Sequence, residues 1–301
     1  MSRMLRVSAV AIGMAIASAC APDAGERATV EPGADARAGS ASRTTTDAPR
    51  VVSLVPSLTE LVIALGAGDR LVARTDYDRQ PELAHLPSVG GGLDPNFETL
   101  VGVGADVVLV AATRDAPALS ERLTSLSIDA RSFEIQTIDQ MYRSTGLLGE
   151  LLGRAEAADS LVASVSVALD EVRSRVAGRD PVPVFYVGWS DPPMTTGPGT
   201  FVDEVIRIAG GRNVFDDAPL EWPTVGFEAI VARAPEVILW PRGDVAEGAL
   251  DRLRSTPGWR EVEAVQEGRI ELIDADTFNR PGPRVVLAAR GLADVLHPDA
   301  R

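Results

Sequence analysis

Runs of consecutive apolar residues alternate along most of this chain with stretches that are apolar at every third or fourth position. The first pattern predicts strands buried on both faces, and the second predicts helices that cover them. The alternation starts at the β-branched run from Val51 to Val55, continues through a helix ending near Gly66, and is present again in the second half of the chain. It predicts an α/β fold with parallel sheets flanked by helices.

The first helix has a recognisable start signal. Pro56 ends the apolar run, and Ser57 and Glu60 stand at the spacing of a capping box. We therefore expect Ser57 to be the N-cap of this helix, with the Glu60 side chain returning to the helix start. The sequence RLVARTDY then predicts a second strand, which ends close to Tyr77.

One helix-then-strand phrase occurs twice. NFETLVGVGADVVLV, residues 96–110, aligns without a gap with GFEAIVARAPEVILW, residues 226–240, and the alignment pairs Glu98 with Glu228. The repeat indicates two similar lobes. The glutamates have a structural explanation, because an acid in the first turn of a helix gains about 0.3–1 kcal/mol from the helix dipole.

Between the two halves, residues 137–178 have helical spacing and no strand pattern. The second part places Leu161, Val165, Leu169 and Val172 on one face of a helix that spans more than about 30 Å. The predicted fold is two lobes with central parallel sheets flanked by helices, joined by a long rigid connecting helix. The predicted parts are an N-terminal lobe at residues 50–136, connecting helices at 137–180 and a C-terminal lobe at 181–301.

Residues 1–19 are predicted to be an export signal. Arg3 and Arg6 precede an apolar stretch that is too short to span a membrane and that ends in small residues. Cys20, the only cysteine, follows directly and resembles the lipidated cysteine of a bacterial lipobox; the alternative is an ordinary secretory signal with a chance cysteine. Residues 21–49 carry almost no large apolar side chains, which is typical of a flexible tether.

Charge and composition narrow the possible functions. The 301 residues carry a formal net charge of −14, which makes nucleic acid an improbable partner. With only two histidines and no nucleophile motif, we expect no catalytic residues, metal site or cofactor. An enzyme of the cell envelope, with the paired acids Asp274 and Asp276 as its catalytic residues, is the weakest alternative.

Ligands of open parallel sheets bind beyond the carboxyl ends of the strands. Only 5% of the residues are aromatic, yet several of them fall at these ends, where they suit a large flat or partly apolar ligand. Alternatively, the tryptophans cap cores and the arginines are solvated. The candidate ligand-binding residues are Tyr77, Trp189, Met194, Trp222, Phe278, Arg242 and Arg280.

Several motifs in order resemble one known family. They are RVVSLVPSLTELVIALG, TDY, the repeated phrase, DPPMTTG, EWPTVG and RPGPRVVLAARGL, which together cover roughly residues 50–297. The chain resembles the periplasmic binding proteins of vitamin B12 and iron-chelate importers, and most of all their cobalamin-binding members.

This resemblance implies a monomeric receptor that performs no chemistry. It would sit on the periplasmic side of the cell envelope, held only by a lipid at Cys20, and deliver a large metal chelate to an ABC importer. In the family, one exposed glutamate on each lobe pairs with arginines of the two permease subunits, and Glu98 and Glu228 occupy the matching positions. Tyr77 and Trp222 match residues that contact the corrin ring.

Two positions depart from the cobalamin-binding pattern. Gly92 and Ala111 stand near positions where the cobalamin-binding protein has tryptophans. The ligand class therefore stays open between a cobalamin-like corrinoid, a haem held through the Tyr77 phenolate and a ferric siderophore. An envelope sensor or scaffold that docks a partner other than a transporter is the alternative of another class.

Overall fold

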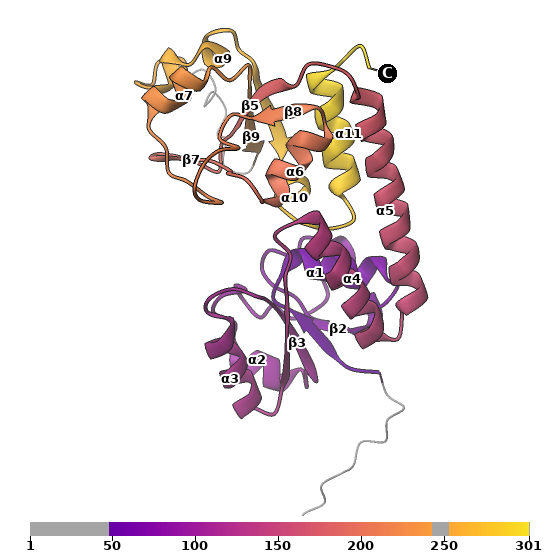
Figure 1. The fold of residues 1–301 in the computed structure, drawn as a ribbon. Coiled ribbons are helices and arrows are strands. Elements are labelled where there is room, and N and C mark those ends of the chain that lie inside the picture. Colours follow the sequence, from indigo (N-terminus) through magenta and orange to yellow (C-terminus); the bar gives the residue numbers. More distant parts are fainter. Residues whose placement is uncertain (1–47, 243–252, 301) are drawn as a thin grey trace, which may run out of the picture. The chain divides into compact units, whose positions relative to one another are not determined.

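The computed structural model describes residues 48–242 and 253–300. The predicted export signal, Cys20 and most of the tether lie outside these residues. Two parallel four-stranded sheets follow one another along the chain (Figure 1). This arrangement confirms the predicted α/β class with parallel sheets flanked by helices.

The first sheet has the strand order β2-β1-β3-β4. Its strands are β1 (Val51–Ser53), β2 (Leu71–Ala73), β3 (Val107–Ala111) and β4 (Asp129–Phe133). The helices around it are α1 (Pro56–Ala64), α2 (Phe97–Gly102) and α3 (Ala116–Ser125), with short 3-10 turns η1 (Gly68–Arg70) and η2 (Pro81–Leu83). We call this sheet and its three helices the N-terminal lobe.

The second sheet has the order β10-β9-β5-β8. Its strands are β5 (Val182–Tyr186), β8 (Gly211–Asn213), β9 (Val237–Arg242) and β10 (Ile270–Asp274). Around it lie a hairpin of β6 (Trp189–Ser190) and β7 (Pro193–Met194), a 3-10 turn η3 (Trp259–Glu261), and helices α6 (Phe201–Ile208), α7 (Phe227–Arg233), α9 (Glu263–Gln266), α10 (Ala275–Phe278) and α11 (Val285–Leu296). We call this part the C-terminal lobe.

The two sheets share one topology. In each, the first strand in sequence pairs with the second on one side and the third on the other, and the fourth strand pairs with the third. The repeated phrase forms α2 and β3 in the first sheet and α7 and β9 in the second. Each copy therefore supplies the third strand of its sheet, as expected for two similar lobes.

Helices α4 (Ile138–Leu152) and α5 (Ala155–Val176) join the sheets. A capping box of Thr137 and Gln140 starts α4, and Gly153, with a φ of 65°, ends it in the left-handed conformation that glycine adopts readily. The 22 residues of α5 span about 33 Å at 1.5 Å per residue. α5 lies alongside α11 (Figure 1).

A single apolar core runs from the first sheet through these helices to the second. It includes Leu61 of α1, Met141 of α4, Leu169 of α5 and Leu292 of α11. Strand residues alternate between this shared core and a smaller core on the far face of their own sheet. In β3, for example, Val107 and Leu109 face the shared core while Val108 and Val110 face the other one. This two-sided burial explains why the strands are apolar at consecutive positions.

The predicted N-cap of α1 was wrong by two residues. The helix begins at Pro56, with Val55 as its N-cap and no side-chain cap, because the fixed φ of proline suits the first helical position. Glu60 does not return to the helix start. Its carboxylate instead pairs with Arg280 and Arg284 of the C-terminal lobe.

The shared core predicts that the lobes unfold together. Leu169→Ala, at a fully buried position, should lower the free energy of unfolding by about 2–5 kcal/mol. Val167→Ala, on the exposed side of the same helix, should change it by about 0.5 kcal/mol or less. Urea unfolding should be followed by circular dichroism, which reports on both lobes, and by tryptophan fluorescence, which reports on the C-terminal lobe. Two separate transitions would contradict a common core.

Candidate ligand-binding site

The carboxyl ends of parallel strands lie at one edge of each sheet, and the loops that follow them carry most of the candidate residues. In the N-terminal lobe, a cavity of about 250 Å³ opens at this edge. Its walls are mainly apolar and come from the start of α1, the loop around residue 92 and the connection from β3 to α3. They include Leu54, Tyr77, Gly92, Leu93, Ala111 and Leu119.

Tyr77 projects from a turn that is itself firmly held. The backbone N–H and the hydroxyl of Thr75 both donate to Oδ2 of Asp78, each at 2.8 Å, and the Tyr77 N–H donates to the Thr75 hydroxyl at 3.2 Å. Thr75 and Asp78 are buried, whereas Tyr77 is 56% exposed. A large aromatic ring is thus presented to solvent from a fixed backbone.

Gly92 and Ala111, the two positions that the sequence resemblance predicts to depart from the cobalamin-binding pattern, both line this cavity. A Cβ on Gly92 would lie 2.2 Å from the carbonyl oxygen of Leu54, so no other residue fits without moving the loop. The loop beside Trp222 has a matching contact, because a Cβ on Gly197 would lie 2.1 Å from the carbonyl oxygen of Leu220. Close backbone packing, rather than an indole ring, therefore bounds the site at residue 92.

Two tryptophans are exposed in the C-terminal lobe. Trp189 is 61% exposed, and its Nε1 donates to the carbonyl of Asp191 at 2.8 Å. Met194 pairs with Trp189 across the β6-β7 hairpin and is half-buried. Trp222 is 43% exposed and packs edge-to-face on Tyr186, with 6.4 Å between the ring centroids.

The Tyr186 ring, which packs against Trp222, is itself held in place by burial and by a hydrogen bond. Burial raises the pKa of Tyr186 far above the ordinary tyrosine value, so its hydroxyl stays protonated and donates to Oδ1 of Asn279 at 2.6 Å. One part of the Trp222 indole thus packs against the buried Tyr186 ring, and the exposed part remains available for contact.

Three of the predicted residues lie elsewhere. Phe278 is only 6% exposed and belongs to the shared core, so its prediction as a ligand contact is corrected. The cause is α10, a single helical turn in which Oδ1 of Asp274 accepts from the N–H of Thr277 at 2.8 Å. Arg280 is enclosed by protein groups, and Arg242 is exposed at the end of β9, where its Nη2 donates to the carbonyl of Leu272 at 3.4 Å.

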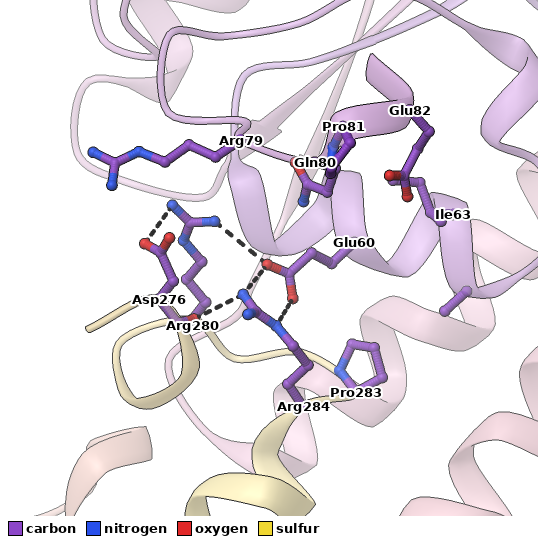
Figure 2. Close-up of a pocket in the computed structure, with 11 residues that line it drawn as sticks. Glu60, Ile63, Arg79, Gln80, Pro81, Glu82, Asp276, Arg280, Pro283 and Arg284 are labelled. Atoms are coloured by element: carbon purple, nitrogen blue, oxygen red, sulfur yellow. Dashed lines mark hydrogen bonds and ion pairs between the residues drawn. The ribbon is translucent and has the colours of Figure 1, made fainter. Parts of the chain in front are cut away.

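The enclosure of Arg280 reveals an ion cluster that the sequence did not predict. Glu60 of α1 pairs with Arg280 and Arg284, and Arg280 also pairs with Asp276 (Figure 2). The hydrogen bonds to Glu60 raise the pKa of Arg284 above its ordinary value. The spacing of Arg280 and Arg284 ahead of a helix was visible in the sequence, but their partner on α1 was not.

Glu98 and Glu228 occupy equivalent places. Each is the second residue of its helix, α2 or α7, and both side chains are exposed. Neither makes an ion pair within the part of the chain that the structure describes. The duplicated glutamate therefore faces solvent in both lobes.

Residues 48–242 and 253–300 contain neither a candidate metal site nor a candidate membrane-spanning helix. No group of three or more His, Cys, Asp or Glu side chains could hold a metal ion. In the same residues, no helix combines the length and the apolar character needed to cross a membrane.

Comparison with known proteins gives a consistent result. Residues 51–277 match the family model described as periplasmic binding protein. The vitamin B12-binding protein of Vibrio cholerae is 27% identical, with 83% of this chain and 89% of that protein covered. An ABC transporter substrate-binding lipoprotein of Bacillus subtilis, YvrC, is 30% identical, with 83% and 80% covered.

Solved structures agree on the fold. The crystal structure of the vitamin B12 binding protein BtuF of V. cholerae superposes with a TM-score of 0.70 at 27% identity, covering 83% of this chain and 96% of that one. The periplasmic heme-binding protein BhuT, in complex with two hemes, gives a TM-score of 0.72 at 27% identity, covering 83% and 100%.

Two sheets of equivalent topology, joined by α4 and α5, are thus a feature of the fold that this chain shares with solved periplasmic binding proteins. The chain belongs to the periplasmic binding protein family. It is a substrate-binding protein of the kind that serves ABC importers, and its relatives are binding proteins rather than enzymes, which confirms the expected lack of catalysis.

The close packing at Gly92 can be tested directly. Gly92→Ala should lower the free energy of unfolding by about 1–3 kcal/mol, because the new methyl group cannot avoid the Leu54 carbonyl without moving the loop. Gly146→Ala is the control, since nothing lies within 4 Å of its Cβ position in α4, and it should stabilise the helix by up to about 1 kcal/mol. Thermal unfolding monitored by circular dichroism measures both, and equal effects would contradict the steric explanation.

Proposed function

We propose that this protein captures a cobalamin-like corrinoid at the strand ends of its two lobes and delivers it to an ABC importer. The observation that carries the proposal is the set of exposed aromatic rings from both lobes, Tyr77, Trp189 and Trp222, on backbones that hydrogen bonds and core packing hold in place. Rigid aromatic faces suit a large, flat, partly apolar ligand. The similarity to vitamin B12-binding proteins supports a corrinoid.

A haem is the second candidate. The exposed phenol of Tyr77 could supply an oxygen ligand to ferric iron, and a heme-binding protein is as similar to this chain as the vitamin B12-binding protein of V. cholerae. A ferric siderophore is the third candidate, since the same aromatic faces would accept a chelate of another shape. The candidate contact residues are Tyr77, Trp189, Met194 and Trp222, with Arg242 at the rim.

The ligand should be identified by calorimetry and absorbance with cyanocobalamin, haemin and ferric siderophores. We expect cyanocobalamin to bind and Tyr77→Ala and Trp222→Ala each to weaken binding about tenfold, the effect of one lost aromatic contact. Leu147→Ala, which removes an exposed apolar side chain from α4, should leave the affinity unchanged. Binding of haemin alone, with an absorbance change that Tyr77→Phe abolishes, would replace the corrinoid by haem. Absence of binding for every chelate would refute the ligand class.

Glu98 and Glu228 are proposed as the two docking contacts for the permease. Their equivalent positions suit a partner with two similar subunits, each offering a basic side chain. The predicted lipid at Cys20 would hold the receptor at the membrane surface, and the name of the B. subtilis relative, a lipoprotein, supports that anchor.

Charge reversal separates docking from ligand binding. Glu98→Lys and Glu228→Lys should each weaken the complex with the permease in a pull-down or transport assay while the ligand affinity stays unchanged. Glu156→Lys is a matched control, because Glu156 is also an exposed acid in the first turn of a helix, α5, but lies outside the repeat. Loss of ligand affinity together with docking would show that the glutamates are structural.

A further inference from the structure

The ion cluster around Glu60 joins the two lobes beside a cavity of about 470 Å³ (Figure 2). The Glu60 side chain is 8% exposed and accepts from Nε of Arg284 at 3.0 Å and from Nη2 of Arg284 at 2.5 Å. Arg280 adds a longer contact from Nη1 to Glu60 at 3.4 Å. Glu60 thus retains a two-point pair with Arg284 that does not involve Arg280.

Arg280 itself contacts three different segments. Beyond Glu60, its Nη2 lies 2.7 Å from Oδ1 of Asp276 and donates to the carbonyl oxygen of Tyr77 at 3.0 Å. Its side chain is 14% exposed. A planar guanidinium with acceptors on three sides has one orientation, which makes Arg280 a fixed donor rather than a mobile rim residue.

The bond to Tyr77 completes the support of that turn. Thr75 and Asp78 fix the backbone from within the N-terminal lobe, and Arg280 fixes the carbonyl of Tyr77 from the C-terminal lobe. Since a carbonyl oxygen defines the plane of its peptide, this contact restricts the ψ rotation of Tyr77, and with it the position of the backbone from which the exposed ring projects. The direction of the Tyr77 ring therefore depends on a residue of the opposite lobe.

We propose that Arg280 is a positioning residue: it acts on the ligand through the Tyr77 carbonyl, holding the ring at the angle the ligand requires, and does not itself contact the ligand. The proposal deepens the proposed function, because it rests on Tyr77 as a ligand contact. It also replaces the expectation that Arg280 binds the ligand directly.

The first test needs no ligand. The protein contains three tyrosines, so incorporation of 3-fluorotyrosine gives three ¹⁹F resonances, and Tyr77→Phe assigns that of Tyr77. Arg280→Gln should shift or broaden the Tyr77 resonance and leave that of Tyr142 unchanged. The pair of Glu60 with Arg284 remains in this variant, so we expect it to fold.

Arg79→Gln is the matched control. Arg79 lines the same cavity, lies two residues from Tyr77, and makes no hydrogen bond or ion pair among the residues that the structure describes. Like Arg280→Gln, the Arg79→Gln variant removes one positive charge, but it leaves the contact of Arg280 with the Tyr77 carbonyl intact. The Tyr77 resonance should therefore not shift. An unchanged Tyr77 resonance in Arg280→Gln, or an equal change in Arg79→Gln, would overturn the proposal.

The second test is a double-mutant cycle on the affinity for cyanocobalamin, or for haemin if only haemin binds. Arg280→Gln should weaken binding about tenfold, the cost of one charge-assisted hydrogen bond, but less than about twofold when Tyr77 is already alanine. Arg280→Lys should recover part of the loss. Additive effects would mean that Arg280 contacts the ligand and would overturn the positioning role. If Tyr77→Ala leaves the affinity unchanged, the proposed ligand site fails, and the ¹⁹F spectra still decide whether Arg280 positions Tyr77.

Discussion

The two sheets of this protein each bury one face in the same apolar core, to which helices α4 and α5 also contribute. Residues of both sheets and of these helices form one continuous apolar core, so moving one lobe relative to the other would expose surface that is now buried. This constraint makes the strand-end loops of the two lobes a largely preformed surface. A receptor built this way selects ligands by the shape and chemistry it already presents rather than by wide closure of a hinge.

Polar contacts at the margins of the core strengthen the same connection. Glu60 of the N-terminal lobe is held by Arg280 and Arg284, and Glu204 of α6 accepts from the N–H of Ile138 at the start of α4 at 2.6 Å. Separating a buried carboxylate from its partners leaves an uncompensated charge, which costs several kcal/mol. These ion pairs and hydrogen bonds resist sliding of one lobe past the other as well as separation of the lobes. The apolar core alone would resist sliding less.

Local sequence patterns predicted the parts of the fold that depend on local physics. Consecutive apolar runs became two-sided strands, and the apolar spacing of Val165, Leu169 and Val172 became the buried face of α5. The failures share one cause. Glu60 stood at a capping-box spacing, but its partner Arg284 lies 224 residues further along the chain, and no local pattern could reveal that contact. Phe278 likewise follows a strand in the sequence, as a ligand contact would, but the single helical turn of α10 places its side chain in the core.

The same reasoning applies to the candidate site. The exposure of Tyr77 and Trp222 could be predicted because polar residues and prolines surround both, whereas the cavity beside Tyr77 is lined by segments that lie far apart in the sequence, so no local pattern revealed it. Gly92 is imposed by the Leu54 carbonyl, so no larger side chain fits at this position without moving the loop. Aromatic faces would then hold the flat part of a ligand while the apolar cavity accepts a projecting group. A binding surface divided in this way discriminates among chelates by their projecting groups as well as by their rings.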